Sequence, residues 1–151
     1  MALKGDRKYN IGVDIHYFMN ETAERGVVVT HSTSASGAFM DDANAVVKVP
    51  TGTGDGVAAG LLLNDMVNLD LTRTHVNWHQ DEVQLGGKVA VLHHGEVTTN
   101  KLKSGDTPSA GDSAYFDTNG ELTTSAGSAK VGRFLGSKDE DGYVKVHINI
   151  S

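Results

Sequence analysis

The clearest hydrophobic pattern in the chain is alternation with a period of two, which is typical of a strand with one buried and one solvated face. Between Ile11 and Tyr17, apolar residues hold every second position. The C-terminal segment Tyr143–Ile150 alternates in the same way. Its polar positions, predicted to face water, are Lys145, His147 and Asn149, and its predicted core positions are Val144, Val146, Ile148 and Ile150.

Short apolar runs between glycine-rich turns predict further strands. The hairpin signal is strongest at Asn119-Gly120, because these residue types adopt the backbone angles of a tight turn. We also predict that Lys88–Leu92 and Gly95–Thr99 form a hairpin, and that Val131–Leu135 pairs with the C-terminal strand. The other predicted strands are Val27–Thr30, Val46–Val49, Ser113–Phe116 and Glu121–Thr124.

Several segments lack a regular period. Gly56–Asp70 fits neither a helical face nor strict alternation, and its Asn and Asp residues favour a strand, a loop and a second strand over a helix. Thr72–Glu82 is polar and predicts a long connection with at most one helical turn. We expect a mobile loop at His31–Gly37 and a surface loop at Asn100–Ala110.

The composition agrees with an all-β protein. Gly makes up 18 of 151 residues, and aromatic residues are only 6%. Many turns and short strands follow from this composition. We predict an all-β fold, a small antiparallel β-sandwich or a partly open β-barrel with long loops. Residues 1–10 form an extended N-terminal arm in this prediction, and residues 11–151 form a single β domain.

Charge and cysteine content narrow the class of function. Thirteen basic and 19 acidic side chains give a formal charge of -6, which argues against direct binding of nucleic acid. The absence of Cys excludes disulfides, thiolate nucleophiles and Cys-based metal sites. No apolar run is long enough to span a bilayer or to act as a secretory signal, so we expect neither membrane insertion nor export.

The chain carries no recognisable catalytic motif. His75 and His79 have the spacing of two zinc ligands on one helical face, but no Glu stands between them as a general base. Gly52–Gly56 lacks the third glycine of a dinucleotide fingerprint and the Lys of a P-loop, and Asp139–Gly142 lacks the spacing of a calcium loop. We therefore expect a binding protein rather than an enzyme, with no cofactor and no metal.

Six short motifs follow one another between Gly86 and Ile150, a stretch of about 65 residues. They are Gly87–Leu92, Gly95–Asn100, Gly111–Asp117, Asn119–Thr123, Val131–Leu135 with its Gly-Arg pair, and Val144–Ile148. In this order they resemble the capsid cement, or head decoration, proteins of tailed bacteriophages. The long first half, especially Asp70–Val83, departs from compact members of that family.

The resemblance implies a structural protein of the virion that is made in the host cytoplasm and binds the outer surface of the icosahedral head. It implies the major capsid protein as a partner, bridging of its subunits against the pressure of packaged DNA, and self-association as a homotrimer. The arm would then order on docking and add a strand to the capsid. Many identical weak contacts would strengthen one another through multivalency.

Four residues are candidate contacts with the capsid or with another subunit: Leu3, Tyr9, Ile11 and Trp78. For the first three, simple fraying of the N-terminus is the alternative. A contact role for Trp78 agrees with the enrichment of aromatic residues at the centres of interfaces. The alternative for Trp78 is a buried structural side chain. Arg133 matches the Gly-Arg pair of the resembled motif, with a solvated strand residue as its alternative.

Two other functions stay open. A carbohydrate- or receptor-binding virion module would need an exposed aromatic platform, for which one Trp, four Tyr and four Phe are available. A His-dependent metal hydrolase would contain stoichiometric zinc and lose activity with a chelator.

Overall fold

A computed structural model of the chain describes residues 3–4, 12–37, 46–52, 56–63, 67–69, 77–79, 82–83 and 86–150. These residues form fourteen strands and no helix, and hence no helix in this part of the chain is long and apolar enough to cross a membrane. The strands are β1 (Leu3–Lys4), β2 (Gly12–Met19), β3 (Ala23–Glu24), β4 (Val28–Ser32), β5 (Val46–Lys48), β6 (Ala58–Leu62), β7 (Val67–Leu69), β8 (Asn77–His79), β9 (Glu82–Val83), β10 (Lys88–Thr99), β11 (Ser113–Phe116), β12 (Leu122–Thr123), β13 (Gly132–Phe134) and β14 (Val144–Asn149).

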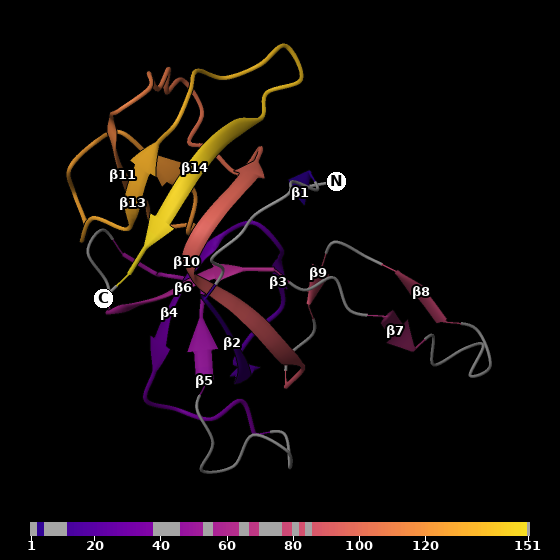
Figure 1. The fold of residues 1–151 in the computed structure, drawn as a ribbon. Helices are drawn as coiled ribbons and strands as arrows, with labels where there is room; N and C mark the ends of the chain where they lie inside the picture. Colours follow the sequence, from indigo (N-terminus) through magenta and orange to yellow (C-terminus); the bar gives the residue numbers. More distant parts are fainter. Residues whose placement is uncertain are drawn as a thin grey trace.

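Ten of these strands belong to one mixed, mostly antiparallel sheet (Figure 1). Its order is β12-β11-β13-β14-β10-β2-β5-β4-β6, with β1 paired to β10 beside this path. Strands β2 and β5 are parallel, and the other pairs are antiparallel. Two small two-stranded sheets, β3-β9 and β7-β8, lie outside it. The prediction of an all-β fold is confirmed.

The far end of the sheet returns to its middle, because β6 also pairs with β10. The contact consists of two residue pairs, Val91 with Leu62 and Leu92 with Leu61. Strands β10, β2, β5, β4 and β6 therefore form a partial ring rather than a barrel. Such a return hides the edge of β6, which would otherwise offer unpaired backbone groups to other chains.

Strand β10 is the centre of this arrangement, and its length contradicts the predicted hairpin. Lys88–Thr99 is one continuous strand of 12 residues, and Gly95 pairs with Ile148 instead of turning the chain. One edge of β10 pairs with β2 and then with β1, and the other edge pairs with β6 and then with β14. A single strand thereby joins both halves of the molecule.

The C-terminal half agrees with the sequence pattern. Strands β11 and β12 form the predicted hairpin, and Gly120 adopts a φ of 75° at its turn. Strands β13 and β14 pair antiparallel as predicted. Val144, Val146 and Ile148 are buried, as the alternation predicted. Strands β13 and β14 fold as their local signals indicate because each has one face in the core and one facing away from it.

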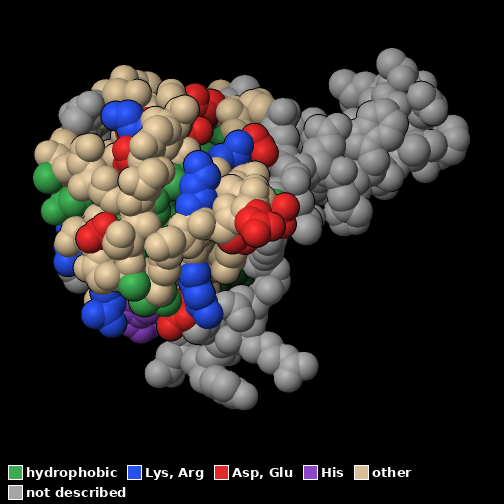
Figure 2. Space-filling model, turned by 90° about the horizontal axis from the view of Figure 1, so that it is seen from above, with side chains coloured by type: hydrophobic (Ala, Val, Ile, Leu, Met, Phe, Trp, Pro, Cys, Tyr) green, Lys and Arg blue, Asp and Glu red, His purple; other side chains and the backbone are tan. Residues whose placement is uncertain are grey.

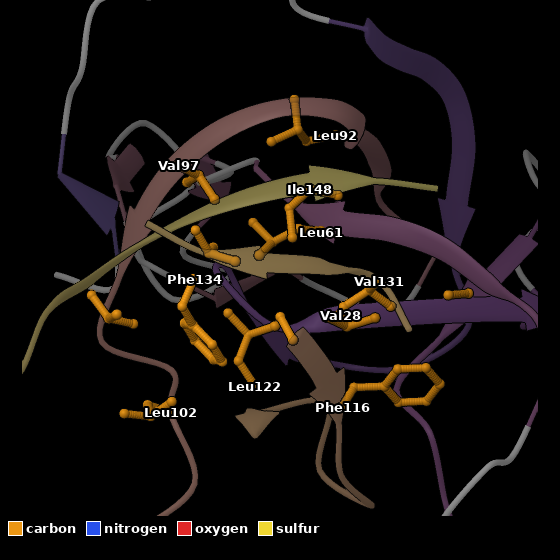
Figure 3. Close-up of a cluster of buried hydrophobic side chains, with 14 residues drawn as sticks. Val28, Leu61, Leu92, Val97, Leu102, Phe116, Leu122, Val131, Phe134 and Ile148 are labelled. Carbon is orange, nitrogen blue, oxygen red and sulfur yellow. The ribbon is translucent and has the colours of Figure 1, made fainter. Parts of the chain in front are cut away.

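The buried side chains form two separate clusters. One fills the space under β10, β11, β13 and β14, and Figure 3 shows the Phe134, Leu122 and Ile148 side chains converging there. The second lies within the partial ring and includes Met19, Val47 and Val89. Burial of these apolar groups supplies the main driving force for folding.

Strands β4 and β6 separate the two clusters and are buried on both faces. In β6, Leu61 faces the first cluster and Leu62 faces the second, while in β4 Val28 and Val29 divide in the same way. A strand buried on both faces reads as a continuous apolar run rather than an alternation. This explains why Gly56–Asp70 showed no clear period, although both predicted strands are confirmed by β6 and β7. Residues 64–66 between them lie outside the described residues.

The predicted alternation in the first long strand is wrong at Ile15, which is 65% exposed. Tyr17 pairs with Val89 and Asp14 pairs with Val91, so two residues of β2 oppose the single residue Ala90. This is a β-bulge, and it breaks the alternation of faces. Ile15 therefore lies on the surface although its position in the pattern indicated the core.

The polar segment Thr72–Glu82, predicted as a connection with a helical turn, contains strand residues where the structure describes it, and its residues 72–76 and 80–81 lie outside the described residues. Asn77–His79 forms β8, which pairs antiparallel with β7, and Glu82–Val83 forms β9, which pairs with Ala23–Glu24. The pattern missed these strands because they are two or three residues long. In Figure 1, β7 and β8 lie apart from the ten-stranded sheet.

One polar cluster ties the loop after β10 to β12. An Oδ2 atom of Asp106 accepts hydrogen bonds from the Thr123 hydroxyl at 2.6 Å and from the Thr124 amide at 2.8 Å. Burial by itself would raise the pKa of Asp106, but these hydrogen bonds outweigh it and lower the pKa below its ordinary value of 3.8. The carboxylate form therefore stabilises the folded state.

Replacement of Gly60 should destabilise the ring. A Cβ atom at Gly60, whose φ is 154°, would clash with the Leu92 carbonyl oxygen and the Val91 side chain. We expect Gly60→Ala to lower the free energy of unfolding by about 2–5 kcal/mol in urea titrations. Gly136→Ala is the control, because no atom lies within 4 Å of its added Cβ, and it should change stability by less than about 0.5 kcal/mol. Equal effects of the two substitutions would contradict the close approach of β6 to β10.

Asp106→Ala should destabilise the chain by about 1–3 kcal/mol at neutral pH, because the Thr123 hydroxyl loses its acceptor. A group with a lowered folded pKa contributes its full stability above the unfolded pKa and loses it as the pH falls through the folded pKa. The difference between wild type and variant should therefore be constant at neutral pH and shrink below about pH 3.8. A difference that is independent of pH in acid unfolding experiments would show that the charge contributes nothing.

Candidate docking surface

The structure places two of the four predicted contact residues, on different sheets. Leu3 lies in β1, where it pairs with Thr99 of β10. Trp78 lies in β8, opposite Asn68 of β7. Tyr9 and Ile11 lie outside the described residues, as do the side chains of Leu3 and Trp78. The contact roles of all four therefore stay predictions.

The histidines do not form a metal site in the described residues. His79 lies in a strand, so the helical spacing proposed for His75 and His79 is wrong at His79, while His75 lies outside the described residues. Across the described part of the chain, no group of three His, Cys, Asp or Glu side chains is placed to hold a metal ion.

His93 and His94 are neighbours in β10 but contact different strands. The Nδ1 atom of His93 lies 3.2 Å from a carboxylate oxygen of Asp14 in β2, without the alignment of a hydrogen bond. The Nδ1 atom of His94 lies 3.4 Å from the side-chain oxygen of Asn149 in β14, and its ring packs edge-on against His147. Each imidazole thus interacts locally, and the two do not face one ion.

A surface cavity lies over the paired strands β13 and β14, at the end near the C-terminus. We call it the β13–β14 pocket. Its volume is about 380 Å³, and it is lined by Lys130, Gly132, Arg133, His147 and Asn149. Arg133 and His147 are direct cross-strand partners, so the register of this pair brings both side chains to one place. Arg133 is therefore an exposed strand residue that lines a surface concavity.

The β13–β14 pocket is cationic in a chain of formal charge -6. Lys130 and Arg133 are exposed, and no acidic residue lines the pocket. Glu96 of β10 pairs with His147 on the side of β14 away from β13. Its carboxylate is 3.5 Å from the Lys145 ammonium. The pocket thus presents positive charge to any group that enters it.

A second hollow of about 260 Å³ adjoins the pocket and adds apolar surface. It shares Lys130 and Asn149 with the pocket and is bordered by Val57, Ala129 and Ile150. Val57 is 69% exposed, which is unusual for a large apolar side chain next to a strand. Arg is enriched at protein interfaces, so Arg133 near this apolar surface is compatible with a protein contact.

Two large hydrophobic side chains, Ile15 and Val57, are exposed in the described part of the chain. The sequence pattern placed Ile15 in the core and gave Val57 no role. Their exposure follows from the bulge in β2 and from the position of Val57 just before β6. It depends on strand register and not on residue type, so the sequence pattern could not predict it. The face in Figure 2 shows positive and negative side chains interspersed, with hydrophobic side chains in small separate areas.

These features describe an all-β protein with a contoured surface. Its described residues present a rigid β scaffold, a cationic pocket and isolated apolar contacts. The chain matches the model of a family described as structural cement protein (E217 gp24/Pam3 gp6) over residues 12–149. No match was found among curated proteins.

The chain belongs to this structural cement protein family. It is therefore a non-enzymatic component of the phage capsid, and the resemblance drawn from its C-terminal motifs is confirmed. The match also covers the first half of the chain, including the segment Asp70–Val83 that departed from the compact pattern.

Proposed function

We propose that this protein binds the outer surface of the phage head and bridges neighbouring subunits of the major capsid protein. On the head, it self-associates as a homotrimer. The single observation that carries the proposal is the family match over residues 12–149. A cement function requires contact with more than one subunit, because stabilisation comes from linking parts of the shell that would otherwise separate.

The position of the N-terminus supports a docking arm. Leu3–Lys4 pairs with Thr98–Thr99 at an edge of β10, which shows that this part of the chain can add a strand to a sheet. An extended arm that paired with a capsid strand would gain main-chain hydrogen bonds in the same way. Residues 1–10, with Leu3 and Tyr9, are therefore the proposed arm.

Ile11, Ile15 and Trp78 extend this proposed contact beyond the arm. Ile11 joins the arm to β2, and exposed Ile15 follows four residues later. Trp78 lies in the β7-β8 sheet, apart from the main sheet in Figure 1. A specific interface buries about 800 Å² on each partner, so two footprints would take about a fifth of the 7980 Å² surface. The chain is large enough to contact two subunits.

The described aromatic side chains do not favour a sugar-binding module. A carbohydrate platform needs exposed aromatic faces, and the described part of the chain shows none: Tyr115 and Tyr143 are half-buried. The other described aromatic side chains are buried, namely Tyr17, Phe18, Phe116 and Phe134.

Purified protein should bind shells of the major capsid protein that lack it and raise their resistance to heat. Shells saturated with the protein should disassemble at a higher temperature than bare shells, because bridging adds contacts that must break first. Co-sedimentation measures binding, and light scattering during heating measures shell stability. Saturated binding without any change in the transition temperature would contradict bridging.

Ile15→Asp should weaken shell binding at least tenfold without changing the fold, because Ile15 is exposed and buries little in the free protein. Ile15→Val, which keeps an apolar side chain, is the matched control and should bind within about twofold of wild type. Deletion of residues 2–10 should weaken binding as well. Thermal unfolding of each variant confirms the fold, and undiminished binding by both Ile15→Asp and the deletion would contradict these contacts.

A further inference from the structure

The acidic side chains of the described residues are almost all engaged by local partners. Asp14, Glu24 and Glu96 lie within ion-pair distance of His93, Lys101 and Lys145, and Glu21 accepts a hydrogen bond from the Val49 amide. Asp112, Asp117 and Asp139 accept hydrogen bonds within their own turns, and Asp106 accepts one from Thr123 of β12. Glu140 is different. It is exposed at the turn between β13 and β14, and within the described part of the chain it has no such partner.

Two cations of the β13–β14 pocket are also left without a partner. Lys130 and Arg133 are exposed, and among the described residues neither has a hydrogen bond or an ion pair. Most other described Lys and Arg side chains do interact locally, for example Lys101 with Glu24 and Lys145 with Glu96. The side chains of Lys138 in the turn and Lys103 in the loop after β10 also have no hydrogen bond or ion pair among the described residues. The β13–β14 hairpin and the residue before it nevertheless carry unneutralised charges of both signs.

Among the described residues, these opposite charges make no contact with one another within one chain. The turn with Glu140 connects Phe134 to Val144, whereas the pocket lies at the other end of the strands, near Gly132 and Asn149. The ends of β14, Val144 and Asn149, are five positions apart, which corresponds to roughly 17 Å of extended chain. Figure 1 shows the turn and the C-terminus at opposite ends of β14.

The turn itself is held in a fixed shape. A carboxylate oxygen of Asp139 accepts hydrogen bonds from the amides of Asp141 and Tyr143, at 3.0 and 2.7 Å. With Lys138, Asp139, Glu140 and Asp141, the turn carries a net charge of -2. A preorganised acidic turn loses little conformational freedom on docking, which favours binding.

We propose that the Ser137–Gly142 turn of one copy of this chain docks into the β13–β14 pocket of the next copy, with Glu140 facing Lys130 and Arg133. The pocket of about 380 Å³ has room for the tip of a turn, and Val57 and Ile150 provide apolar contact beside it. Such a contact is heterologous, since two different surfaces meet, and it generates a ring when the rotation closes. The inference rests on the self-association included in the proposed function and names its interface.

Charge reversal tests the contact in the absence of any capsid shell. Sedimentation velocity of the purified full chain should show an oligomer that dissociates as salt increases. Glu140→Lys and Arg133→Glu should each raise the dissociation constant at least tenfold, and the double variant should recover most of the loss. Lys88→Glu, an equal charge reversal at an exposed residue at the start of β10, is the control and should leave association unchanged.

Cysteine cross-linking tests the geometry, because the natural chain contains no Cys. Ala129→Cys borders the pocket and Ser137→Cys lies in the turn, and both keep the proposed charge pair. A mixture of the two single variants should form a disulfide between positions 129 and 137 under mild oxidation. Each variant alone should form far less dimer, since a heterologous contact does not bring two identical positions together.

A monomer at concentrations up to 100 µM, full association of both single charge variants, or failure of the double variant to recover would overturn the inference. So would efficient 129–129 or 137–137 cross-links in place of the mixed one. Shell binding is measured separately. Oligomers that fail to bind shells would contradict the proposed capsid function alone, whereas shell binding by a chain that stays monomeric would contradict only the proposed self-association.

Discussion

The continuous hydrogen bonding of β10 is the constraint on which the rest of the structure depends. Its 12 residues pair with β2, β1, β6 and β14, so every other strand of the large sheet is positioned directly or through one of these neighbours. Val89 and Val91 enter the cluster inside the ring, while Leu92 and Val97 enter the cluster under the C-terminal strands. Both cores therefore form around one strand, which couples the two halves of the molecule mechanically.

This coupling suits a protein that bears load. The proposed bridging would transmit force between neighbouring shell subunits, and a sheet resists such force because its strands are linked through many backbone hydrogen bonds. The surfaces proposed for contact lie on or beside this frame: Leu3 pairs with β10, Ile15 projects from β2, and the pocket of Arg133 lies over β13 and β14. Function here follows from placement on a rigid frame and not from a reactive group.

The sequence predicts the parts of the fold that have one wet face. Alternation located β14, and Asn119-Gly120 located the β11-β12 hairpin, because local chemistry decides both. It failed where tertiary pairing decides. Gly95 looked like a turn but continues β10, and Ile15 looked buried but lies in a bulge set by the register with β10. The pocket could not be predicted from the sequence for the same reason, since Arg133 and His147 become neighbours only through strand pairing.

Electron cryomicroscopy of shells decorated with this protein tests the central claim most directly. The account predicts density for the β scaffold on the outside of the shell, in contact with at least two capsid subunits at each site. Density inside the shell, or outside but confined to a single subunit, would contradict it.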